Sequence, residues 1–234
     1  KDLQERVSQL NAEGAALDIN YDKFKSHIGP IAEGMGVSAM EAINLAAASE
    51  RLGIAIGVGG AEAAKLKMNF EMIAGVSRDI TDDYLKQATA LAEQAGVVPS
   101  FVMKDVANSS EMMAKYTKDG GKNILTAAIN AKKFGVNLAT VEKITDSLLD
   151  IETSINKEFE ASVMIGKQLN FQTARQKALQ GDVSGAVEDV VGQLGGAAEF
   201  AKLDVLQRKS LAGAIGLSVT ELSKFMNKQG EVNN

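Results

Sequence analysis

The sequence lacks cysteine and tryptophan, and its 234 residues include only two prolines and three tyrosines. Without cysteine, disulfides, thiolate metal sites and a cysteine nucleophile are excluded. The scarcity of proline and aromatic residues, beside abundant Ala, Leu, Ile, Val and Met, favours helices over sheets. Hydrophobic residues still make up 45% of the chain, so we expect a sizeable buried core.

An excess of positive charge is also missing, since the formal net charge is −5. The whole chain is therefore a poor electrostatic match for a nucleic-acid backbone. Residues 1–10 are polar and charged, unlike a signal peptide. The least polar run, residues 52–64, is shorter than the roughly 20 residues that a membrane-spanning helix needs. Because the sequence begins with Lys1 and not Met, we expect a piece of a longer protein or a processed product.

Apolar residues recur every three or four positions through most of the chain, which is the period of an amphipathic helix. No segment shows the period of two that marks strands. The longest pattern predicts one continuous helix over about residues 138–165. We therefore predict an all-α fold, an irregular array of helical hairpins with this long helix at its centre. The apolar stripe of the long helix comprises Val141, Ile144, Leu148, Ile151, Ile155, Phe159 and Val163.

One short pattern, a glycine followed by an apolar residue and usually a capping residue, recurs between the expected helices. Glycine can take the left-handed conformation that ends a helix, the apolar residue packs back onto that helix, and Ser or Asn caps the next one. The unequal spacing of the copies favours irregular hairpins over a regular solenoid. The copies are GVS at Gly36 and Gly75, GVV at Gly96, GVN at Gly135 and GLS at Gly216.

The glycine-rich stretch GIAIGVGG at residues 53–60 is the expected hinge of the chain. We predict an N-terminal helical segment over residues 1–56 and a main helical domain over residues 57–234, with the boundary near Gly57–Gly60. The same glycines complete neither a dinucleotide-binding fingerprint nor a phosphate-binding loop, and no predicted strand precedes them. A hinge or a close helix contact is the better interpretation.

Residue types that often carry chemistry have structural interpretations in this sequence. The lone His27 has no second histidine or cysteine with which to hold a transition metal, and we expect a polar surface residue near a helix end. The carboxylates Asp82 and Asp83, and also Asp146 and Asp150, are expected on solvated faces.

Asp182 lacks the spacing of a calcium loop, and we expect it to cap a helix. The methionines of the helical stretches are expected in packing contacts rather than in a pliable binding groove. We predict no catalytic, cofactor or metal site, and a protein that is not an enzyme. The methionines concerned are Met68, Met72, Met103, Met112, Met113 and Met164.

The stretch SLAGAIGLSVTELSKFM, residues 210–226, has the order of a helix-turn-helix. In that alternative, Arg208, Lys209 and Lys224 would contact nucleic acid. The second helix carries one lysine and no Arg, Asn or Gln, which leaves few side chains that could recognise base edges. The same glycine junction also recurs elsewhere in this acidic chain, so a packing hairpin is the favoured interpretation and nucleic acid is an unlikely partner.

From Leu91 to Met226 the sequence resembles the tail tape-measure proteins of long-tailed bacteriophages. The similarity lies in textural motifs and not in catalytic signatures. The most specific of these motifs are DSLLDIE at residues 146–152, GKQLN at 166–170, ARQKALQGD at 174–182 and the segment from Val205 to Leu222.

The resemblance implies a mostly helical, elongated protein inside the tail tube, which takes part in tail assembly and in setting tail length. It also implies several copies running together, tail-tube or other tail proteins as partners, and a location in the virion tail after assembly in the host cytoplasm. No catalytic residue is carried over from the family. Even one unbroken helix of this chain would reach only about 350 Å at 1.5 Å per residue, which is too short to span a phage tail. We therefore expect one domain of a tape-measure protein.

Overall fold

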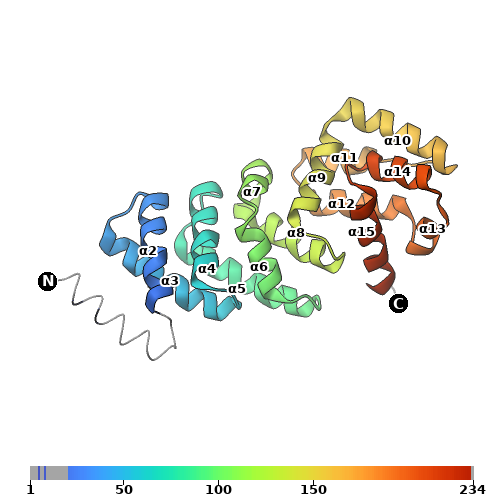
Figure 1. The fold of residues 1–234 in the computed structure, drawn as a ribbon. Helices are drawn as coiled ribbons and strands as arrows, with labels where there is room; N and C mark the ends of the chain where they lie inside the picture. The colour runs from blue at the N-terminus through green and yellow to red at the C-terminus, as the bar shows by residue number, and fades with distance from the viewer. Residues whose placement is uncertain (1–4, 6–7, 9–20, 233–234) are drawn as a thin grey trace. The chain divides into compact units, whose positions relative to one another are not determined.

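The computed structural model describes residues 21–232 together with Glu5 and Ser8. Among these residues every regular element is a helix and none is a strand, which confirms the predicted all-α class (Figure 1). No helix in this part of the chain is long and apolar enough to cross a membrane. The chain divides into two compact units, which are described separately.

The first unit comprises the described residues up to Gln94 and the segment Val98–Ser110. Helix α3 packs against both α2 and α4, and α6 packs against α4 and α5. Its core includes the buried side chains of Leu66, Phe70 and Leu85. The elements are α2 (Tyr21–Met35), α3 (Ala39–Ile56), α4 (Gly60–Met68), the π-helix η1 (Asn69–Ile73), α5 (Arg78–Gln94) and α6 (Pro99–Ala107).

This division differs from the domain boundary expected near Gly57–Gly60. Gly57 ends α3 with a left-handed φ of +75°, and the Val58 N–H donates to the Gly53 carbonyl at 2.9 Å. The stretch is therefore a tight turn between α3 and α4, which pack against each other within the first unit. Glycine content marks such a turn but does not distinguish it from a linker between separate cores.

The second unit comprises Ala95–Val97 and the described residues from Glu111 onward. Its core includes Ile124, Ile144, Phe171 and Phe225, all fully buried. The elements are α7 (Ser110–Tyr116, with Ser110 grouped in the first unit), the 3₁₀-helix η2 (Asp119–Gly121), α8 (Lys122–Lys133), α9 (Leu138–Leu149), α10 (Ile151–Ile165), α11 (Gln172–Leu179), α12 (Val183–Leu194), α13 (Ala197–Lys202), α14 (Val205–Ala214) and α15 (Val219–Val232).

The recurring glycine junctions have the predicted geometry. All five glycines have positive φ, between +64° and +73°. Beyond four of them, the N–H of the apolar residue bonds to a carbonyl of the preceding helix, five residues earlier in three cases and six in the fourth, which closes the helix as the left-handed cap requires. These four bonds run from Val37 to Ala32, Val76 to Phe70 (six residues earlier, past the π-helix), Val136 to Ala131 and Leu217 to Ala212.

The single long helix predicted over residues 138–165 is wrong, because the chain forms α9 and α10 with a break at Asp150 (φ −76°, ψ 75°). Only this residue leaves the helical region, so the apolar periodicity runs through the break unchanged. A break of one residue leaves the three- to four-residue spacing of the apolar side chains unchanged, so this spacing does not reveal that the helix changes direction. The break separates a buried apolar stripe on α9 from an exposed one on α10.

Three of the six methionines highlighted by the sequence, Met103, Met112 and Met113, are fully buried, as the packing interpretation predicts. Two others, Met72 and Met164, belong to the exposed large hydrophobic side chains. A helical position is therefore insufficient to predict burial, since the face of the helix decides it.

Candidate functional site

Helix α10 carries apolar side chains on the side that faces away from its own core contacts. Ile155, Phe159 and Val163 follow each other at intervals of four residues, and Phe159 and Val163 are 72% and 65% exposed. The buried positions of the same helix are the small residues Ser154 and Ala161. Side chains four apart share one helix face, so α10 presents an apolar stripe to solvent.

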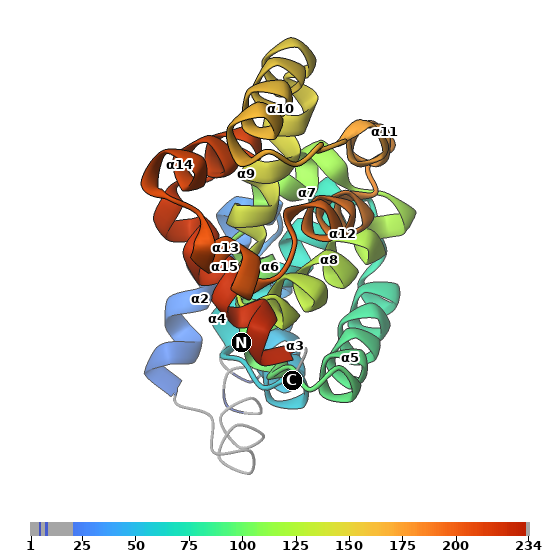
Figure 2. The same ribbon diagram turned by 90° about the vertical axis from the view of Figure 1, so that its right-hand side faces the viewer.

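Helix α14 packs against α10 (Figures 1 and 2) and adds further exposed apolar side chains. Val205 and Leu206 at the start of α14 are among the exposed hydrophobic residues, and Val205 is 79% exposed. Met164 and Leu206 line the same hollow of about 310 Å³. We call the set Ile151, Ile155, Phe159, Val163, Met164, Val205 and Leu206 the α10–α14 surface.

Polar contacts fix α10 against the segment that follows it. The Arg175 guanidinium lies 2.7 Å from the Glu158 carboxylate and 3.1 Å from the Ser154 hydroxyl. The same carboxylate accepts the Phe171 N–H at 2.9 Å, and the Ser162 hydroxyl accepts the Leu169 N–H at 3.0 Å. The side chains of Glu158 and Arg175 are largely buried, and these contacts attach α10 to the segment that follows it.

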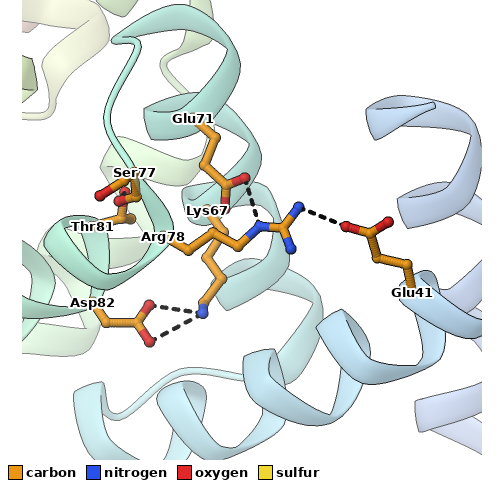
Figure 3. A network of polar contacts seen from close by, with 7 residues as sticks. All are labelled: Glu41, Lys67, Glu71, Ser77, Arg78, Thr81 and Asp82. Atoms are coloured by element: carbon orange, nitrogen blue, oxygen red, sulfur yellow. Dashed lines mark hydrogen bonds and ion pairs between the residues drawn. The ribbon is translucent and has the colours of Figure 1, made fainter. Parts of the chain in front are cut away.

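A second polar cluster, in the first unit, joins α3, α4, η1 and α5 (Figure 3). Lys67, only 4% exposed, lies 2.8 Å from Asp82, so the Asp82 carboxylate, expected on a solvated face, is only 30% exposed and is paired with a buried cation. Arg78 donates to Glu71 at 3.0 Å and to Glu41 at 3.1 Å. The hydrogen bond to Glu71 is the main cause that raises the pKa of Arg78 above its ordinary value. Each of the two cations is thus paired with at least one carboxylate, and the pairs hold the four helical elements together.

The π-helix η1 takes part in this polar cluster through Glu71, which is one of its residues. Asn69, its first residue, donates from Nδ2 to the Ala107 carbonyl at the end of α6, at 3.3 Å. π-Helical turns are frequent at functional sites, but here the widened turn is used to pack η1 against neighbouring helices.

In the second unit, the Tyr116 hydroxyl donates to Asp146, and Lys115 lies within 3.2 Å of Glu111, Glu142 and Asp146. Burial, with the Asp146 carboxylate, raises the pKa of Tyr116. The hydrogen bond to Glu142 is the main cause that raises the pKa of Lys115. Through these contacts, Tyr116 and Lys115 of α7 are joined to Glu142 and Asp146 of α9.

The remaining candidates have structural positions. His27 lies within α2 beside Glu50 of α3, with its ring nitrogen 3.2 Å from the carboxylate and its side chain largely buried, so the expected surface position is wrong. Asp146 and Asp150 are exposed, as expected. Asp182 accepts the Gly185 N–H at 3.0 Å, which confirms the predicted cap. Among the described residues, no group of three or more His, Asp or Glu side chains could hold a metal ion.

The structure does not unite the three basic residues of the nucleic-acid alternative in one site. Arg208 donates to the Ala201 carbonyl at 2.8 Å and lies 5.2 Å from the centre of the Phe200 ring. Lys209 lines the hollow between α10 and α14, and Lys224 lines a different hollow beside α9. Arg208 is therefore committed to internal contacts.

Comparison of the chain with family models, with curated proteins and with solved structures found no match. The candidate sites are therefore compared by whether their side chains already have partners within the described chain. The buried ion pairs join helices to each other, whereas the α10–α14 surface lacks a partner within the described chain. Sequence periodicity identified the four members on α10, Ile151, Ile155, Phe159 and Val163, as part of the stripe of one long helix, and it did not single out Val205 and Leu206 of α14.

Proposed function

We propose that this protein is a structural component that works by packing its helices against other proteins, in the tail of a long-tailed bacteriophage. The observation that carries the packing role is the exposed apolar stripe of α10. Monomeric soluble proteins seldom expose large contiguous apolar areas, and such areas mark interaction sites. The proposed role needs no catalysis, and we propose none.

The setting in a phage tail rests on the resemblance of residues 91–226 to tape-measure proteins. In that setting the chain is a domain of the tape-measure protein, and its partners are tail-tube proteins and further copies of itself. A helical stripe with a large aromatic residue at its centre suits such contacts, because interface energy concentrates in a few well-buried apolar anchors. Phe159 is the most exposed member of the stripe and is the expected anchor.

The test is association of the full chain, alone and with the tail-tube protein encoded beside it, measured by light scattering and by co-purification. We expect the double substitution Phe159→Ser and Val163→Ser to weaken association at least tenfold, the loss of about 1.4 kcal/mol that one good anchor supplies. The matched control is Leu179→Ser on α11, which removes an apolar side chain that is 68% exposed outside this surface.

Two outcomes would contradict the proposal, and they are distinguishable. A chain that stays monomeric and binds no tail protein contradicts the packing role. A chain that associates through Phe159 but ignores the tail-tube protein contradicts only the phage-tail setting. Equal losses for the α10 double variant and Leu179→Ser would show that the stripe has no special part in association.

A further inference from the structure

The hollow of about 310 Å³ between α10 and α14 has apolar side chains in its lining. Two of them, Met164 and Leu206, belong to the exposed large hydrophobic residues. Gly213 lines the hollow from α14, and an added Cβ there would meet no atom within 4 Å. Cavities of about 150 Å³ bind benzene, so the hollow has room for one aromatic ring.

Phe159 is a protruding aromatic side chain on the same surface. It is mostly exposed, and the next residue of α10, Glu160, lines the hollow. One surface therefore carries both an aromatic side chain without cover and a hollow that has room for one. Such a surface can pair with its own copy about a two-fold axis, because each contact is then made twice.

The charged residues around the hollow have both signs. Lys157 and Glu160 on α10 and Lys209 on α14 line it, and all three are exposed. Within the part of the chain that the structure describes, none of the three forms an ion pair. A phenylalanine that entered the hollow of another copy would bring its neighbour Glu160 to the two lysines there. Lysine ammonium groups are also attracted to the face of an aromatic ring, so the two sides of this contact are complementary in charge.

We propose that Phe159 of one copy inserts into the hollow between α10 and α14 of a second copy, which inserts its own Phe159 in return. The inference rests on the packing role proposed above and names the partner of the α10–α14 surface as another copy of this chain. The aromatic side chain, the hollow and both signs of charge are all present on one chain. Two copies fill both hollows, so we expect this association to stop at a dimer.

Sedimentation equilibrium of the full chain over a range of concentrations tests the proposal, because it gives both the mass and the dissociation constant. We expect a dimer whose dissociation constant rises at least tenfold in Gly213→Leu, since the leucine occupies the hollow while every member of the α10–α14 surface is kept. Gly192→Leu on α12 is the matched control and should leave the dimer unchanged. Gly192 also lies in the last turn of a helix, and an added Cβ there likewise meets nothing within 4 Å.

Charge reversal tests the polar side of the same contact. Glu160→Lys should weaken dimerisation about fivefold, because it places a positive charge beside the lysines of the other copy. Adding Lys209→Glu to the same chain should recover part of this loss, since the pair forms again with its signs exchanged. Absence of any recovery would contradict the contact. Circular dichroism of each variant checks that the helices are intact.

Failure of this inference is distinguishable from failure of the proposed function. Association that needs Phe159 but is unaffected by Gly213→Leu would overturn the insertion and leave the packing role in place. A chain that binds the tail-tube protein yet stays monomeric alone would overturn only the second copy as partner, whereas a chain that does neither contradicts both proposals. Equal losses in Gly213→Leu and Gly192→Leu, or a mass that grows beyond two copies, would also overturn the reciprocal insertion.

Discussion

At the scale of single residues, Gly216 combines two demands that only glycine meets together. Its φ is +73°, and a Cβ there would lie 2.5 Å from Ser147 Cβ. Gly166, in the same unit, has nearly the same φ of +67° but no neighbouring atom within 4 Å of an added Cβ. The sequence pattern predicted the left-handed conformation at Gly216, whereas the contact with α9 depends on residues some seventy positions away.

We expect Gly216→Ala to lower the free energy of unfolding by about 2–4 kcal/mol, because left-handed strain and overpacking against α9 add. Gly166→Ala, which suffers only the strain, should cost about 1–2 kcal/mol. Urea unfolding followed by circular dichroism measures both. Equal costs for the two variants would contradict the close packing of Gly216 on α9.

The polar residues behave differently from the glycines. Lys67 and Asp82, or Glu158 and Arg175, lie far apart in the sequence and follow no period, so no local pattern pairs them. Their pairing needs the tertiary structure, because a buried charge is stable only beside a partner that the fold brings to it. This is why Asp82 was expected on a solvated face.

At the scale of elements, the start of α15 shows how a local signal and a distant contact reinforce each other. Ser218 and Glu221 form a reciprocal pair, in which the Ser218 hydroxyl accepts the Glu221 N–H and Glu221 accepts the Ser218 N–H. Such a capping box is readable from spacing. The ion pair of Glu221 with Lys143 of α9 is not, since 78 residues separate them.

The hydrogen bond from Lys143, followed by those from Ser218, lowers the pKa of Glu221 from its ordinary 4.5 to about 2. A carboxyl with a lowered pKa in the folded state stabilises that state above its unfolded pKa and loses this effect as the pH falls. We therefore expect Glu221 to contribute to stability above about pH 4.5, and this contribution to vanish between about pH 4.5 and 2.

Urea unfolding at a series of pH values measures this dependence. Glu221→Gln should make stability fall less steeply over that window. Lys143→Gln should have a smaller effect in the same direction, since Ser218 still hydrogen-bonds the carboxylate. An unchanged slope in Glu221→Gln would contradict the lowered pKa.

Helices α9 and α10 show what periodicity leaves open. Both have an apolar stripe, but α9 buries its stripe and α10 exposes its own. The distinction arises because α10 makes its contacts through small side chains and the Glu158–Arg175 pair. Periodicity reports that a helix has two unlike faces, and it does not report which face meets the rest of the protein.

At the scale of the whole molecule, the two units have separate cores. The buried Lys67–Asp82 pair belongs to the first unit, and the contact of Gly216 with α9 belongs to the second. Units with their own cores open as separate cooperative regions. A change in one core is therefore expected to leave the opening of the other unchanged.

We expect Lys67→Met to lower the opening free energy of the first unit by about 2–3 kcal/mol, because it leaves Asp82 partly buried without its cation. Native-state hydrogen exchange should show this loss in α3–α5 and unchanged protection in α8, α9 and α12. Glu41→Gln is the control and should cost below about 1 kcal/mol, since its pair with Arg78 is half-exposed. A loss spread evenly over both units would contradict separate opening.

The sequence by itself determines the all-α class, the left-handed glycines that end the helices and the caps at Asn137 and Asp182, because these depend on residues within a few positions of each other. Only the tertiary structure decides the break at Asp150, the division into two units, the pairing of buried charges and the exposure of the apolar stripe on α10. Each of these depends on side chains that distant segments bring together. Burial and electrostatic energy depend on contacts between segments that are distant in the sequence, so a pattern of neighbouring residues does not predict them.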